Sequence, residues 1–263
     1  MFKREMKINF KSYIIWTSVL IGLFLIVFLV YPSIINSENM EMIDEMIKIF
    51  PEEILKAFNM DISSIDTAFG WLKTEGFIFV LLITGIYSGI LGSNILVKEE
   101  SDKTIEYLNS VPVTRKSIVL NKIFCGFFYI ILMIVTIGIF NFIGLSLSGE
   151  FDVKSYILLS MTPLFTSVVI FTLCLFLSTF AHKTKKTFGI SLGIVFASYF
   201  LNVISEMGES TEFLKYLSIF TLADIRNVII NASINPVMIV LTIVISGILI
   251  ALTMIRYEKK ELL

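Results

Sequence analysis

Residues Ile123–Leu147 read IFCGFFYIILMIVTIGIFNFIGLSL and contain no charged side chain in 25 positions. A membrane-spanning helix needs about 20 apolar residues, and a charge at mid-bilayer costs at least about 2.5 kcal/mol. This stretch is therefore typical of a helix that crosses a bilayer. Five further charge-free stretches have a similar length: Ile14–Tyr31, Phe77–Val97, Tyr156–Ala181, Phe188–Ile204 and Val237–Ile255.

These six stretches together predict the fold class. None of the 21 basic and 22 acidic residues of the chain lies in any of them. We therefore expect an all-α integral membrane protein in which residues 1–263 form a single transmembrane domain of six spans. A span free of Asp, Glu, Lys and Arg also argues against a proton relay or an ion-coupled transporter, because both depend on ionisable groups inside the membrane. Cys125 and Cys174 fall in spans, where free buried thiols are expected.

The basic residues predict the orientation of the spans, because Lys and Arg are retained on the cytoplasmic side. Only six of them flank the other side of the predicted membrane region. Both termini are thus expected in the cytoplasm, with the protein in the plasma membrane. The basic residues on the expected cytoplasmic side are Lys3, Arg4, Lys7, Lys11, Lys98, Lys103, Arg115, Lys116, Lys122, Lys183, Lys185, Lys186, Arg256, Lys259 and Lys260.

The N-terminal arm, residues 1–13, interleaves apolar side chains with four basic ones. Two interpretations fit this pattern equally well. The arm is either a short amphipathic helix lying on the inner leaflet or the positively charged flank of the first span. The apolar core of that span is longer than the hydrophobic region of a signal peptide, so we expect a permanent anchor.

Two outer loops carry helical patterns of their own. In residues 32–76 the apolar side chains Ile43, Met46, Ile47 and Phe50 share one helix face, and a second helix is expected to start at Pro51. In residues 205–236 a helical stretch places Leu222, Ile225 and Ile229 on one side. These small amphipathic helices either pack on the outer membrane surface or form a lid.

Two pairs of glycines have the spacing that allows membrane helices to approach closely. Gly85 and Gly89 form one G-x-x-x-G pair, and Gly189 and Gly193 form another. We expect helix packing at both. The partner helix belongs either to the same chain or to a second protomer.

The loop between the second and third spans, residues 98–122, begins KEESDKTIEYLNSVPVTRK. Ser101 or Asp102 is expected to cap a short helix, and Ile105 and Leu108 give that helix an apolar stripe. Pro112 ends it, because the residue before a proline avoids helical conformation. Thr114 then caps the helix that leads into the third span.

This loop resembles the corresponding loop of type-2 ABC exporter permeases, and the six-span topology resembles theirs as well. One position departs from the family pattern: Lys103 stands where these permeases usually have glycine. The residues that match the pattern are Glu100, Thr104, Ile105, Glu106, Leu108, Pro112, Val113, Thr114 and Arg115.

The resemblance implies that the loop is a coupling helix that docks on a separate P-loop ATPase subunit. Glu100, Thr104, Glu106 and Arg115 would then make polar contacts, and Ile105, Tyr107 and Leu108 would fill a groove of the partner. It also implies a second permease protomer in a homodimer or heterodimer. ATP and Mg would bind to the partner ATPase, and this chain would bind no cofactor. The alternative is that the loop merely connects two spans.

The sequence lacks the residues that several other classes of function require. There is no G-x-x-x-x-G-K-[ST] loop for a nucleotide, His182 is the only histidine, and Glu99-Glu100 is interpreted as a solvated pair beside the membrane. We therefore expect no catalytic site, no metal site and no nucleic-acid partner. The function expected is the permease subunit of an ATP-driven exporter for a lipophilic or amphipathic substrate. The alternative is a membrane scaffold or sensor subunit that binds a cytoplasmic partner without transport.

Overall fold

The structure, a computed structural model, describes residues 1–34, 49, 67–105 and 113–260. In this part of the chain six helices are long and apolar enough to cross a membrane, so the predicted fold class is confirmed. They are α1 (Phe2–Ile34), α5 (Phe77–Ile95), α8 (Arg115–Ser148), α9 (Val153–Ser178), α10 (Thr184–Ser205) and α12 (Pro236–Lys259).

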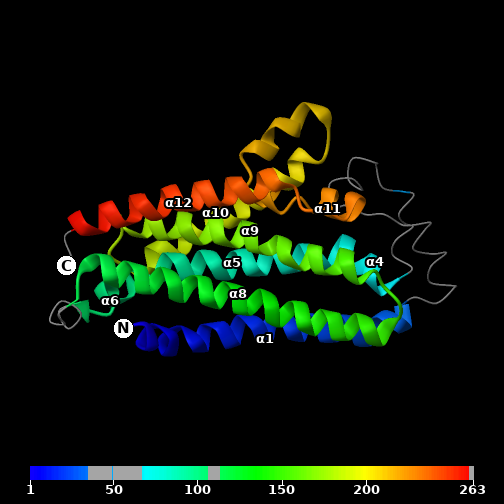
Figure 1. The fold of residues 1–263 in the computed structure, drawn as a ribbon, viewed down its shortest axis with the longest axis horizontal. Coiled ribbons are helices and arrows are strands. Elements are labelled where there is room, and N and C mark those ends of the chain that lie inside the picture. The colour runs from blue at the N-terminus through cyan, green and yellow to red at the C-terminus, as the bar shows by residue number, and fades with distance from the viewer. Residues whose placement is uncertain (35–48, 50–66, 106–112, 261–263) are drawn as a thin grey trace.

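The long helices run side by side along the longest axis of the molecule (Figure 1). The start of α1, the end of α12 and the short helix α6 (Lys98–Ser101) lie at the same end. We call it the inner end, because the sequence predicts that it faces the cytoplasm.

The helix α1 resolves the two interpretations of the N-terminal arm. It is continuous from Phe2 to Ile34, so the arm forms the first turns of the spanning helix and not a separate surface helix. Contacts with α8 hold these turns in place. The Tyr129 hydroxyl donates a hydrogen bond to the Met6 carbonyl (2.5 Å), and the Tyr13 hydroxyl lies 2.9 Å from that of Thr136.

The start of α8 is fixed by a side-chain cap, as the sequence predicts. The Thr114 hydroxyl accepts a hydrogen bond from the Ser117 N–H (3.2 Å), and Thr114 itself is extended. The cap satisfies a backbone donor that has no partner within the helix. The helix therefore begins before the charge-free stretch and carries Lys122 into the bundle.

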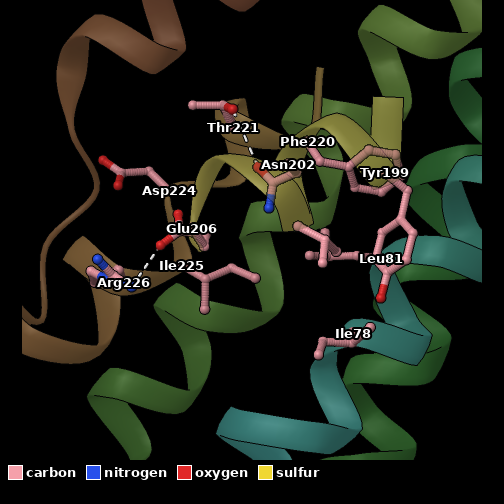
Figure 2. A pocket seen from close by; sticks show the side chains of 11 residues that line it. Ile78, Leu81, Tyr199, Asn202, Glu206, Phe220, Thr221, Asp224, Ile225 and Arg226 are labelled. Carbon is pink, nitrogen blue, oxygen red and sulfur yellow. Dashed lines mark hydrogen bonds and ion pairs between the residues drawn. The ribbon is translucent and has the colours of Figure 1, made fainter. Parts of the chain in front are cut away.

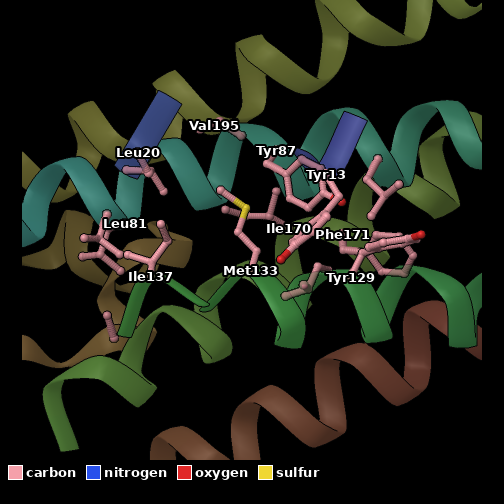
Figure 3. Packing of buried hydrophobic residues seen from close by; sticks show 14 of the residues in the cluster. Tyr13, Leu20, Leu81, Tyr87, Tyr129, Met133, Ile137, Ile170, Phe171 and Val195 are labelled. Carbon is pink, nitrogen blue, oxygen red and sulfur yellow. The ribbon is translucent and has the colours of Figure 1, made fainter. Parts of the chain in front are cut away.

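The core forms around α5, which packs against α8, α9 and α10. Figure 3 shows the buried residues of this region, among them Tyr87, Tyr129 and Phe171. The helix α5 approaches α9 so closely that a Cβ on Gly92 would collide with the Phe171 carbonyl. A side chain larger than hydrogen at this position would push the two backbones apart.

The two predicted glycine pairs have different surroundings. A Cβ on Gly85 would lie 3.2 Å from Phe220, and one on Gly89 would lie 3.3 Å from Val195. The first pair is therefore closely packed against neighbouring elements. A Cβ on Gly189 or Gly193 would meet nothing within 4 Å. Within the described residues, no helix of the same chain packs on the second pair.

The outer end is built from short segments. The helix α4 (Ala68–Trp71) and a π-helical turn, η2 (Leu72–Gly76), lead into α5. Between α10 and α12 lie the 3₁₀ segments η3 (Glu209–Tyr216) and η4 (Ile219–Ala223) and the helix α11 (Ile225–Asn231).

The prediction of one helical stretch through Leu222, Ile225 and Ile229 is wrong in one respect. The chain breaks at Asp224, which has a φ of 43° in the left-handed region, so Leu222 and Ile225 belong to different elements. The helices predicted around Ile43 and from Pro51 lie outside the described residues.

Candidate functional site at the inner end of the bundle

The short helix α6 follows α5 and ends in a Schellman motif. The Lys103 N–H donates to the Glu100 carbonyl (3.2 Å), and the Thr104 N–H donates to the Glu99 carbonyl (2.8 Å). Lys103 has a φ of 55°, a conformation that glycine adopts without steric cost. The position where similar permeases have glycine thus keeps the backbone shape that favours glycine. Ser101 and Asp102 stand at the end of α6, so the prediction that one of them starts a helix is wrong.

The carboxylate of Glu99 belongs to a buried ion cluster that joins three helices. The Lys122 Nζ of α8 donates to its two oxygens at 2.8 and 2.9 Å and to the Ile95 carbonyl at 2.5 Å. The same ammonium lies 3.4 Å from a carboxylate oxygen of Glu5 on α1. Lys122 has no exposed surface.

The carboxylate of Glu100 forms a second cluster with the other side of the bundle. The Lys260 Nζ, just after α12, lies 2.6 Å from one oxygen, and the His182 Nδ1 lies 2.7 Å from the other. Lys260 also donates to the Ala181 carbonyl in the turn between α9 and α10 (2.6 Å). The interpretation of Glu99-Glu100 as a solvated pair is therefore wrong, because partners from several helices compensate for burying both carboxylates.

The guanidinium of Arg115 binds the end of α12. Its Nη1 donates to the carbonyls of Tyr257, Glu258 and Lys260, at 3.4, 3.0 and 2.7 Å. Tyr257 and Glu258 belong to the last turn of α12, where a helix leaves carbonyl acceptors free for partners outside it, and Lys260 follows the helix directly. Arg115 therefore ties the chain after α12 to the start of α8.

The remaining predicted coupling residues are placed as follows. Ile105 is buried against Ile118, with Met1 and Val113 packed beside them. Thr104 is exposed. Glu106, Tyr107, Leu108 and Pro112 lie outside the described residues.

Glu100, Ile105 and Arg115 contact other parts of their own chain in this structure. The carboxylate and the isoleucine are buried, and the guanidinium binds carbonyls at the end of α12. Contact of the predicted coupling residues with an ATPase subunit stays a prediction.

The connections make α6 a junction between the spans. Glu99 reaches α8 and, through Lys122, α1; Glu100 reaches Lys260 and the turn before α10. The Ser101 hydroxyl lies 3.1 Å from that of Thr184 at the start of α10. A displacement of α6 would therefore act on α1, α8, α10 and the end of α12 together.

A cavity of about 100 Å³ lies at the outer end, between α5, α10 and the segments that follow α10. Figure 2 shows its polar side, where the Glu206 carboxylate and the Arg226 guanidinium are 2.6 Å apart. The Thr221 hydroxyl donates to the Asn202 side chain beside them (3.3 Å). Apolar side chains such as Ile78 and Leu81 form the opposite wall.

Four polar residues of the spans fall into two groups. Asn202 lines the outer cavity, and Asn94 lines a second cavity at the inner end. Thr84 and Thr172 instead lie in the core and donate to carbonyls of their own helices. In the described part of the chain, no group of three or more His, Cys, Asp or Glu residues is placed to hold a metal ion.

Sequence reasoning missed Glu5, Lys122, His182 and Lys260 as members of the site. Lys122 and Lys260 were counted only as basic residues beside the membrane. One signal was present in the arm: Glu5 is the only acid among its four basic residues.

Comparison with known proteins identifies the family of this chain. Residues 1–262 of the 263 match the family model described as ABC-2 family transporter protein. No curated protein matches the chain. The match covers almost the whole sequence and agrees with the six spanning helices of the structure. The chain therefore belongs to the ABC-2 family of transporter proteins.

Proposed function

We propose that this protein is the permease subunit of an ATP-driven exporter, which moves a lipophilic or amphipathic substrate outward. Membership of the ABC-2 family makes it the membrane permease component of an ABC transporter, without catalysis of its own. That family implies an ATPase partner. Outward transport, the substrate class and coupling through the loop at residues 98–122 are the parts that we propose.

The observation that carries the coupling proposal is the junction at α6. A partner that pushes or pulls the loop after α6 acts on a helix joined to four other parts of the bundle by buried ion pairs and hydrogen bonds. Buried pairs with these distances resist stretching, because separating them leaves charges in a medium of low dielectric. Movement of α6 would thus be transmitted to the spans and not absorbed locally.

The charge distribution supports an orientation of the protein in the membrane, and an open helix face supports an assembly of two permeases. The basic residues beside the inner end favour a cytoplasmic position for this end and both termini, which would put the outer cavity on the far side of the plasma membrane. Two such permeases with two ATPase subunits form the transporter in this proposal. The open face of α10 around Gly189 and Gly193 is where a second protomer would approach closely.

The test begins with the partner. The protein is purified from native membranes, and a P-loop ATPase should co-purify in stoichiometric amount. Two loop variants then probe coupling: Glu106→Lys reverses a charge, and Leu108→Ala removes an apolar anchor worth about 1–3 kcal/mol in docking. Both should lower transport and substrate-stimulated ATP hydrolysis together, while the amount of protein in the membrane is unchanged. Lys154→Glu, a charge reversal on an exposed side chain at the outer end, is the matched control and should keep full activity.

The results separate the coupling proposal and the exporter function from their alternatives. Full activity of both loop variants with an identified ATPase would show that the loop is only a connector. The scaffold or sensor function instead predicts that the loop variants lose partner binding and that ATP-dependent flux is never measurable.

A further inference from the structure

A cavity of about 250 Å³ lies at the inner end of the bundle, between α1 and α5. Its wall includes the first turns of α1, the last turn of α5 and the beginning of α10. The residues that line it are Glu5, Ile8, Asn9, Ser12, Ile90, Leu91, Asn94, Ile95, Lys98, Asp102 and Thr184. The space is large enough for a small head group with a few methylene groups.

Two acceptors of this wall, Glu5 Oε1 and Asn94 Oδ1, are buried atoms that make no hydrogen bond within the described residues. The Lys122 ammonium lies 3.4 Å from Glu5 Oε1 and pairs with it by charge alone, and Glu5 as a whole is only 2% exposed. A buried polar atom that lacks a partner costs free energy. A ligand that donates N–H groups would remove this cost at both atoms.

The charges around the cavity favour a cation. Lys122 lies 3.4 Å from Glu5, but its hydrogen bonds go to Glu99 and the Ile95 carbonyl, so one ammonium serves two buried carboxylates. Of the side chains that line the cavity, Glu5 and Asp102 are acidic and Lys98 is basic. Lys98 and Asp102 are both exposed and carry opposite charges, so Glu5 is the buried charge of the lining.

The rest of the wall is apolar. Ile8 from α1 and Ile90, Leu91 and Ile95 from α5 line the same cavity as the two acceptors. A cavity with the acceptors of Glu5 and Asn94 beside aliphatic side chains fits a molecule with a cationic head and an apolar body.

We propose that this cavity binds the primary ammonium group of an amphipathic amine, with Glu5 and Asn94 as its acceptors. As a binding site it stands independently of transport; the further statement that the amine is a substrate rests on the proposed exporter function. The Glu5 carboxylate supplies charge and one acceptor, and Asn94 supplies the second acceptor from the facing helix.

The test uses dansylcadaverine, a fluorescent primary amine with an apolar ring system, and its N-acetyl derivative, which has the same body without the charge. Binding is measured by fluorescence anisotropy on the full-length protein in phosphatidylcholine nanodiscs, with empty discs subtracted. The amine should bind about tenfold or more tightly than the acetylated probe, because only the amine offers a charged N–H donor to the Glu5 carboxylate. Equal affinity of the two probes would overturn the proposal.

Variants assign the site. Glu5→Gln should abolish the preference for the amine, and Asn94→Ala should weaken amine binding severalfold without touching the ion cluster. Asn141→Ala is the matched control, since it removes another buried and unpaired Oδ1 that does not line the cavity. Unchanged amine binding in both Glu5→Gln and Asn94→Ala, with a normal melting temperature, would place the ligand elsewhere.

Two further measurements separate the source of the amine and the role of the site. Replacement of part of the phosphatidylcholine by phosphatidylethanolamine should displace the probe if the lipid head group is the ligand, and leave it bound if a free amphiphile is. These binding experiments need no ATPase, so they can succeed while the exporter proposal fails. ATP-driven transport of other molecules by a protein that does not bind the amine would reject only the inference about this cavity.

Discussion

Replacing Lys122 with methionine tests whether the buried cluster of Glu5, Glu99 and Lys122 is held by one cation. The substitution keeps all but the last atom of the side chain's length and leaves two carboxylates in the interior without their ammonium. Removal of one partner from a buried ion pair costs about 3–5 kcal/mol. At about 2–4 °C per kcal/mol for a chain of this size, the melting temperature should fall by about 6–20 °C.

The same cluster predicts the opposite behaviour for Glu5→Gln. At an effective dielectric of about 20, the contact of 3.4 Å between Lys122 and Glu5 gives a gross attraction of about 5 kcal/mol. The Glu5 and Glu99 oxygens on this ammonium are at most about 6 Å apart, so their repulsion is at least about 3 kcal/mol. The remaining attraction of about 2 kcal/mol does not exceed the cost of burying a carboxylate, which is several kcal/mol. Glu5→Gln should therefore leave the melting temperature within about 2 °C of the original value or raise it.

The assay is thermal unfolding followed with a thiol-reactive dye. It suits this chain, because both cysteines, Cys125 and Cys174, are free and buried, as the sequence predicts, and react only when the bundle opens. A triple variant with Glu5→Gln, Glu99→Gln and Lys122→Met is the control and should recover most of the stability lost by Lys122→Met alone. If Glu5→Gln lowered the melting temperature as much as Lys122→Met does, the idea of an excess carboxylate in this cluster would be refuted.

Three other predictions concern the backbone and the topology. Lys103→Gly should stabilise the end of α6 by about 0.5–1 kcal/mol, measured by the same melting assay, because glycine adopts its positive φ without strain; a lower melting temperature would contradict this. Gly92→Ala should cost about 1–3 kcal/mol through collision with the carbonyl of α9, whereas Gly193→Ala, with open space around it, should change stability by less than about 0.5 kcal/mol; equal effects would refute the packing argument. A cysteine at Ser110 should react with an impermeant reagent only from the cytoplasm and one at Ser210 only from outside; reaction of both from one side would overturn the orientation.

The number and type of the long helices could be predicted from the sequence, because the membrane imposes a strong constraint on composition. A bilayer excludes charge over about 20 residues, so each span is visible as a charge-free stretch without knowledge of its neighbours. Helix ends were less well predicted. The helix α1 begins at Phe2 and α8 at Arg115, before the hydrophobic stretches. A helix can extend in this way where a cap such as Thr114 or a neighbouring helix provides hydrogen-bond partners for its end.

The contacts inside the candidate site could not be predicted from the sequence. The motif around Thr104 and Arg115 lies at the same end of the molecule as the buried ion clusters. The partners of Glu99 and Glu100 are 23 and 160 residues away along the chain, and charge counting treats such residues as interchangeable. Only the packing of α1, α8 and α12 around α6 shows which lysine is buried and which is solvated.

Lys122 connects the cavity at the inner end to α6. It pairs with Glu5, which lines the cavity, and with Glu99 on α6. A cation bound at Glu5 would compete with Lys122 for that carboxylate and leave the ammonium entirely to Glu99 on α6. The link between α6 and α8 would then tighten while the link to α1 loosens. By linkage, any force on α6 that changes the position of Glu99 changes the affinity of the cavity by the same coupling free energy. If α6 moves as proposed, a single buried ammonium between two carboxylates would connect an event at the loop to an event at the cavity.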